Sequence, residues 1–240
     1  MTNDHFHDQL LLGFLYPGHA AEDDYPYLAG LLAPPARAEV VHTSVGEDAH
    51  RVDALLDLGS AVRLADGAAE LRGRGVSSVV WACTSGSFVF GWNGAREQAA
   101  ALGQRLGLPA SSTSIAFVDA CRSRGVARVA VAATYPAEVT ERLVDFLGRG
   151  GIEVLAVSSR GIVTAAEVGT LSADAVRDLV LEYDHPDAEA VLVPDTAMHT
   201  ARALDALAVE AGKPVLTANQ VSVWQAARLA GHPGADRLLE

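Results

Sequence analysis

The arrangement of apolar segments along the chain constrains the fold more than any other feature of the sequence. Short apolar runs alternate with longer amphipathic stretches from one end of the chain to the other. The clearest strand candidates cover residues 9–16, 38–44, 76–82, 126–134, 152–159, 188–194 and 213–218. Stretches between them, such as 95–107 and 137–151, have the pattern of helices that end at glycine. This alternation predicts right-handed βαβ units and parallel sheet covered on both faces.

The second half of the sequence repeats the pattern of the first. Residues 10–32 and 126–148 share an apolar strand, a Tyr-Pro pair and a following helix. Residues 107–122 and 212–228 share a Gly-x-Pro start and an apolar helix. Chance similarity of two βαβ segments is the alternative, and we favour an internal duplication.

The duplication predicts an α/β fold of two pseudo-symmetric halves. Each half is expected to be a doubly wound, flavodoxin-like parallel sheet, the first over residues 1–118 and the second over 119–240, with the last helix of the first half able to cross over. Ligands of such sheets bind beyond the carboxyl ends of the strands. We therefore expect one active site between the two halves.

The composition excludes several classes of partner. Eighteen Lys and Arg against 30 Asp and Glu give a formal charge of −12, which disfavours nucleic acid and anionic membranes. Two cysteines argue against a disulfide framework and suit a reducing compartment. The first residues contain neither a signal-peptide pattern nor a membrane span. We expect a cytoplasmic protein, and the sequence leaves homo-oligomerisation open.

Cys83 is the first candidate catalytic residue. It follows the apolar run that ends at Trp81 and precedes Thr84, Ser85, Gly86 and Ser87. A thiolate is the nucleophilic form of cysteine, and amide groups at a helix start can lower its pKa. A buried structural cysteine is the alternative, but the hydroxyl-rich segment behind it favours a functional one. Cys121, in contrast, lies at the helical spacing that is typical of a residue packed in the core.

Asp195 occupies the matching position of the second half, at an offset of 195 − 83 = 112. It follows the apolar strand of residues 188–194 and precedes Thr196, which we include among the substrate-binding candidates. A catalytic role and a helix-capping role for Asp195 are equally compatible with this position.

Further candidates are polar residues near the expected strand ends. Hydrogen-bonding groups there could hold a substrate carboxylate or an enolate in the manner of an oxyanion hole. These substrate-binding candidates are Thr84, Ser85, Tyr135, Tyr16 and Pro17. No zinc, phosphate-loop, flavin or nicotinamide signature is present, so the sequence predicts neither a metal nor a cofactor.

These segments together resemble the Asp/Glu racemase superfamily, within it the branch of maleate cis-trans isomerase and arylmalonate decarboxylase. The resemblance rests on "GFLYPG", "ACTSGSF", "VAVAATYPAEVTERL", "SSRGI", "VLVPDT" and "GKPVLTANQVSVWQAARLAG". It implies a cofactor-independent site in which two cysteines, one from each half, face the substrate. Cys83 matches the first cysteine, whereas Asp195 replaces the second. The resemblance also implies that Thr84 and Ser85 hold a substrate carboxylate and that Tyr135 lies in the active site.

The resemblance leaves several functions open. Our main interpretation is a cysteine-dependent isomerase of a small carboxylic acid, in which the Cys83 thiolate adds to a double bond or Cys83 protonates the carbon beside a carboxylate. The alternative is an arylmalonate-type decarboxylase with an enediolate intermediate. An amino-acid racemase fits less well, because Cys83 and Asp195 are poorly matched acids. A protein that binds a small acid without converting it is the non-enzymatic alternative.

Overall fold

The computed structural model describes residues 9–240 of the chain, in which strands and helices alternate as the sequence predicts. The strands are β1 (Leu11–Pro17), β2 (Arg37–Thr43), β3 (Ser78–Trp81), β4 (Ala110–Ser112), β5 (Arg128–Val131), β6 (Glu153–Val157), β7 (Ala190–Val193) and β8 (Val215–Thr217). The first helices are α1 (Asp24–Gly30), α2 (Val52–Leu58), α3 (Ala61–Leu71), α4 (Ser85–Phe88), α5 (Gly91–Leu106) and α6 (Thr113–Ser123). The later helices are α7 (Ala137–Arg149), α8 (Ala165–Val168), α9 (Ala173–Glu182), α10 (Leu204–Ala211), α11 (Ala218–Leu229) and the 3-10 helix Ala235–Leu239.

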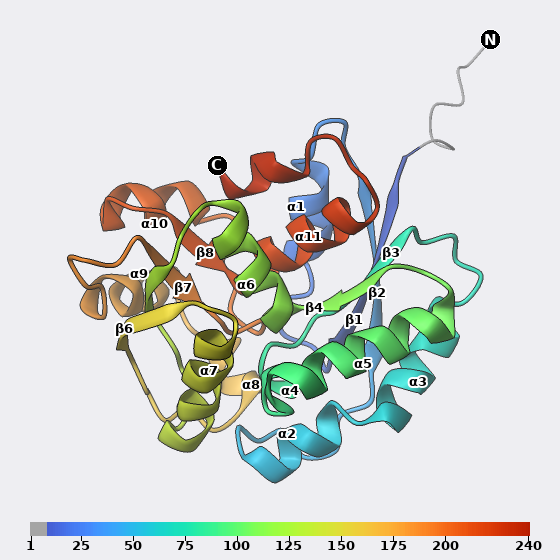
Figure 1. The fold of residues 1–240 in the computed structure, drawn as a ribbon, viewed down its shortest axis with the longest axis horizontal. Helices are drawn as coiled ribbons and strands as arrows, with labels where there is room; N and C mark the ends of the chain where they lie inside the picture. Colours follow the sequence, from blue (N-terminus) through green and yellow to red (C-terminus); the bar gives the residue numbers. More distant parts are fainter. Residues whose placement is uncertain (1–8) are drawn as a thin grey trace.

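The strands form two four-stranded parallel sheets with equivalent topologies. The first has the order β2-β1-β3-β4 and the second the order β6-β5-β7-β8, so each strand of one sheet has a counterpart in the other. Helices surround both sheets, and the two sheets lie in separate parts of the ribbon (Figure 1). The predicted α/β fold of two pseudo-symmetric halves is confirmed.

The central strands explain why the sequence contains continuous apolar runs. Every residue of β3 and of β7 is buried, because each strand has a neighbour on both sides and helices on its faces. Cys83 and Asp195 each lie two residues beyond the last residue of one of these strands. The equivalence that the duplication predicts for these two positions is therefore present in the fold.

The helices between the strands are amphipathic and end where the sequence predicts. Helix α7 buries Val139, Leu143 and Phe146 on one face. Helix α5 ends at Gly107, which has a φ of 69°, a left-handed conformation that glycine adopts without steric cost. Within residues 9–240, no helix has both the length and the apolar character needed to cross a bilayer.

Helix α11 connects the two halves. It follows β8 of the second sheet but also packs against β1, β3 and β4 of the first sheet and against α6. Ser78 at the start of β3 donates a hydrogen bond from Oγ to the Ala226 carbonyl in α11 (2.7 Å). The predicted boundary between residues 118 and 119 falls within α6 and stays a prediction.

Candidate active site

A cavity of about 230 Å³ is lined by residues of both halves. Tyr16 and Cys83 contribute from the first half, and Asp195 and Thr196 from the second. Much of the remaining wall is apolar, including Leu55 from α2. The two residues that the sequence singles out as catalytic candidates thus line the same cavity.

Cys83 lies between β3 and α4 and is 4% exposed. Its Sγ accepts a hydrogen bond from the Gly86 amide at 3.3 Å and lies 3.9 Å from the Ser85 hydroxyl. Burial raises the pKa of the Cys83 thiol to about 12, and these hydrogen bonds only partly oppose that effect. The expectation of a lowered pKa is therefore wrong, because the loss of solvation outweighs the donors of the following turn.

The raised pKa has a direct consequence for the reactivity of Cys83. In a Cys121→Ala background, iodoacetamide should alkylate Cys83 at pH 8 about a hundredfold or more slowly than a free thiol, because so little thiolate is present. The rate should keep rising with pH above about 8.5, where that of a free thiol levels off. Mass spectrometry of quenched time points measures the alkylation rate at each pH. A plateau at or below pH 8.5 would contradict the raised pKa.

Cys121 is buried in the first half, as the sequence predicts. It lies in α6, is fully inaccessible to solvent and does not line the cavity. Burial also raises the pKa of its thiol to about 12. The two cysteines therefore differ in their access to the cavity rather than in acidity.

Asp195 is buried at the end of β7, where both of its carboxylate oxygens accept hydrogen bonds. The Thr134 hydroxyl donates to Oδ2 (2.7 Å), and the Ala197 amide donates to Oδ1 (3.0 Å). The next α-helix, α10, begins only at Leu204, so Asp195 does not cap it. The carboxylate stabilises the turn that follows it and presents its charge to the cavity.

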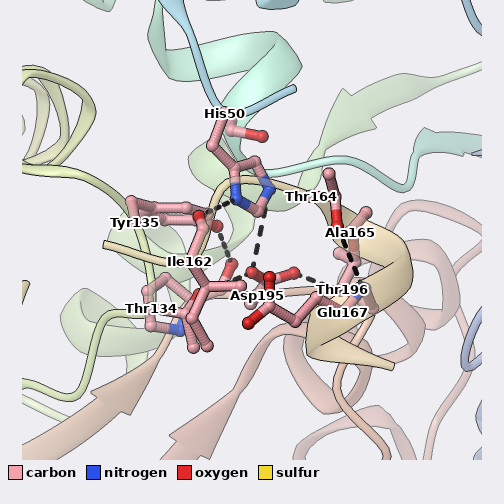
Figure 2. Close-up of polar contacts among 12 residues, drawn as sticks. His50, Thr134, Tyr135, Ile162, Thr164, Ala165, Glu167, Asp195 and Thr196 are labelled. Atoms are coloured by element: carbon pink, nitrogen blue, oxygen red, sulfur yellow. Dashed lines mark hydrogen bonds and ion pairs between the residues drawn. The ribbon is translucent and has the colours of Figure 1, made fainter. Parts of the chain in front are cut away.

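His50 is a site residue that the sequence did not identify. It lies between β2 and α2, and its Nδ1 donates a hydrogen bond to the Ile162 carbonyl at 2.9 Å. This bond leaves Nε2 unprotonated in the neutral ring, and Nε2 lies 4.0 Å from Oδ2 of Asp195. Figure 2 shows the ring of His50 pointing toward Asp195 from the opposite side of the site. His50 and Asp195 also both line the cavity.

The two tyrosine candidates use their hydroxyls within the protein. Tyr16 lines the cavity, but its hydroxyl donates to the Thr196 carbonyl (3.0 Å) and accepts from the Ala21 amide (3.0 Å). Tyr135 is absent from the cavity wall, and its hydroxyl donates to the Pro194 carbonyl at 2.9 Å. Burial raises the pKa of Tyr135, so the hydroxyl stays a donor. Both tyrosines therefore hold the loop that carries Asp195.

The remaining candidates divide into cavity-lining and supporting positions. Pro17, Ser85 and Thr196 line the cavity, whereas Thr84 is buried beside Cys83 and does not line the cavity.

The sequence predicted no metal ligands. The structure nevertheless brings the side chains of His19, Glu22 and His42 together at the rim, where His19 lines the cavity.

Comparisons with known proteins agree on one group of enzymes. Residues 59–238 match the family model described as arylmalonate decarboxylase. Arylmalonate decarboxylase of Bordetella bronchiseptica is 30% identical over 185 residues, which cover 73% of this chain and 76% of the relative. Maleate isomerase of Alcaligenes faecalis is 29% identical over 119 residues, 49% of this chain and 47% of the relative.

A solved structure extends the similarity to almost the whole chain. It is a liganded double mutant of arylmalonate decarboxylase in which one glycine is changed to cysteine and one cysteine to serine. The TM-score is 0.82 at 25% sequence identity, over 97% of this chain and 99% of that one. The cavity, its single cysteine and its buried carboxylate thus lie in a fold shared with these enzymes.

Proposed function

The chain belongs to the arylmalonate decarboxylase family, and from this premise we propose that it decarboxylates a small substituted malonate without a cofactor. The observation that carries the proposal is Cys83, a buried thiol on the wall of a largely apolar cavity. A thiol with a pKa of about 12 is protonated at neutral pH. Such a group is suited to donate a proton to a carbanion, which is the final step of this decarboxylation.

The proposed reaction has two steps. The bond between the central carbon and one carboxylate breaks, carbon dioxide leaves, and the electron pair remains as an enediolate on the other carboxyl group. The Sγ–H of Cys83 then gives its proton to the carbon, and water restores the thiol. Ser85, whose hydroxyl lies 3.9 Å from Sγ, is positioned to hold the retained carboxylate beside the proton donor.

The residues available to surround the departing carboxylate support decarboxylation as the proposed reaction. Leu55, Leu58 and Ala166 supply apolar surface, which stabilises neutral carbon dioxide better than a carboxylate. Asp195 adds a negative charge to the same space. Both features raise the free energy of the bound carboxylate before the bond breaks. This destabilisation ends when carbon dioxide leaves.

Isomerisation of a double bond is the second candidate. The Gly86 amide donates to Sγ at 3.3 Å, and such a bond stabilises the thiolate that would add to the double bond. The similarity to maleate isomerase over about half of the chain supports it as well. Isomerisation requires the thiolate at the start of the cycle, which the burial of Cys83 disfavours.

A proton NMR screen in deuterated water distinguishes the candidates. The panel contains arylmalonates, alkylmalonates, maleate and amino acids. Decarboxylation produces a monoacid with one deuterium at the α-carbon, whereas isomerisation converts maleate to fumarate. Conversion of maleate alone would overturn the proposal in favour of the isomerase. Loss of the α-proton signal of amino acids alone would favour a racemase, and ligand-induced thermal stabilisation without any conversion would indicate a binding protein.

His50 should affect catalysis through Asp195. We expect His50→Gln to lower kcat by up to about a hundredfold, the effect of losing the Asp195 charge itself, because the variant removes the imidazole that holds this carboxylate toward the cavity from 4.0 Å. Steady-state kinetics with a substituted malonate measure kcat for the variant and the parent.

His232 provides a matched control for this variant. It is a buried histidine that also hydrogen-bonds a carbonyl, that of Pro34 at 2.8 Å, but it does not line the cavity. His232→Gln should lower the melting temperature without changing kcat. An unchanged kcat in His50→Gln as well would show that His50 is only structural.

A further inference from the structure

The rim of the cavity contains a cluster of three side chains with ligand-capable atoms. His19, Glu22 and His42 each contribute one such atom, and these atoms all lie within 4.8 Å of one another. His19 and Glu22 belong to the segment between β1 and α1, and His42 lies near the end of β2. Among residues 9–240, no second group of three His, Cys, Asp or Glu side chains meets this criterion.

The ring of His42 is fixed in an orientation that suits metal binding. Its Nδ1 donates a hydrogen bond to the Gly18 carbonyl at 2.5 Å. This bond places the proton of the neutral ring on Nδ1 and leaves the lone pair of Nε2 free. Metal-binding histidines commonly use this arrangement, in which a carbonyl orients the ring and fixes its tautomer.

Glu22 is held as a carboxylate beside the two rings. The Ala20 amide donates to its Oε2 at 2.7 Å, and Nδ1 of His19 lies 3.1 Å from its Oε1. Partial burial opposes ionisation, but hydrogen bonds from the backbone amides of Glu22 and Ala20 outweigh it and lower the pKa of Glu22. The cluster therefore offers a negative charge together with two imidazoles.

His19 gives the cluster access to solvent. Its side chain is 73% exposed, and its ring stacks on that of His42 with the centroids 3.9 Å apart. The hydrogen bond between Nδ1 and Glu22 leaves Nε2 of His19 available to a ligand. Because this ring is largely exposed, it has room to turn its donor atom toward an ion held by His42.

We propose that His19, Glu22 and His42 bind one divalent transition-metal ion, with Zn²⁺ as the probe. Two imidazoles and a carboxylate are ligands that Zn²⁺ and its neighbours in the first transition row accept, and three protein ligands leave a coordination position open. Because His19 also lines the cavity, the ion would lie at its entrance. The proposal is independent of the reaction catalysed inside.

Isothermal titration of the untagged, metal-free chain with ZnCl₂ tests the site. His5 and His7 lie outside the described residues, so every titration uses a His5→Ala, His7→Ala background. We expect one ion per chain and a rise in melting temperature with added Zn²⁺, since the ion binds only the folded form.

Variants of two of the ligands decide between a metal site and an ordinary histidine–glutamate ion pair. His42→Ala and Glu22→Gln should each weaken Zn²⁺ binding by at least about tenfold. Glu22→Gln retains an acceptor for the Ala20 amide and should remain folded. His199→Ala is the control, because His199 is exposed and pairs with Asp23 at 3.1 Å outside the cluster. Absent Zn²⁺ binding, or equal binding by all variants, would overturn the proposal.

Discussion

Cys83→Ser is expected to lower kcat by about 10²- to 10⁴-fold, the range that general acid catalysis contributes, while the fold remains intact. The serine hydroxyl occupies nearly the same volume and can still accept the hydrogen bond that Gly86 donates. It is a far weaker acid than a thiol, so protonation of the enediolate should become rate-limiting. Carbon dioxide release and formation of the protonated acid, followed in single turnovers, measure the two steps separately.

Cys121→Ala is the control for the loss of a buried thiol. Cys121 is buried like Cys83 but lies in α6, away from the cavity wall. Its replacement should lower the melting temperature and leave kcat nearly unchanged. Equal losses of kcat in both variants would mean that the cysteines act through packing alone. A covalent adduct on Cys83 during turnover, detected by mass spectrometry, would favour isomerisation by thiolate addition instead.

The position of the site could be predicted because it depends on strand order. An apolar run followed by small polar residues predicts the end of a buried strand, and two such ends at matching places in a duplicated chain predict a shared cavity. Cys83 and Asp195 lie just beyond two such strand ends and line the same cavity, as this pattern predicts. Their catalytic roles stay predictions.

The role of His50 could not be predicted, because its environment is assembled from distant segments. The residue lies in a loop, and its two partners, Ile162 and Asp195, both come from the second half of the chain. No local pattern around position 50 encodes these contacts. The same limit applies to Tyr16 and Tyr135, whose hydroxyls bond carbonyls that only the folded loop presents.

The acidity of Cys83 was mispredicted for a related reason. The sequence displays the donors that follow the cysteine, and donors lower a thiol pKa. It does not display how completely the surrounding elements exclude water, and that exclusion has the larger effect here. Local sequence thus reports hydrogen-bonding capacity, whereas solvation depends on the whole fold.

Asp195→Asn is expected to lower both KM and kcat for a malonate substrate. Two carboxylates about 6 Å apart repel each other by roughly 3 kcal/mol at an effective dielectric constant near 20, which corresponds to about a hundredfold in binding. Asparagine removes this repulsion and should tighten binding by up to about that factor. Because the repulsion is relieved when carbon dioxide leaves, kcat should fall by a similar factor and kcat/KM should change little.

A matched variant separates the charge of Asp195 from its structural contacts. Asp24 has the same exposed fraction of 4% and accepts hydrogen bonds from the amides of Thr200 and Ala201, but it does not line the cavity. Asp24→Asn should reduce stability without changing KM or kcat. If Asp195→Asn behaves in the same way, its carboxylate serves only the turn closed by the Ala197 amide. A higher KM in Asp195→Asn would instead identify Asp195 as a ligand for a donor or cationic group of the substrate, because removing its charge would then weaken an attraction.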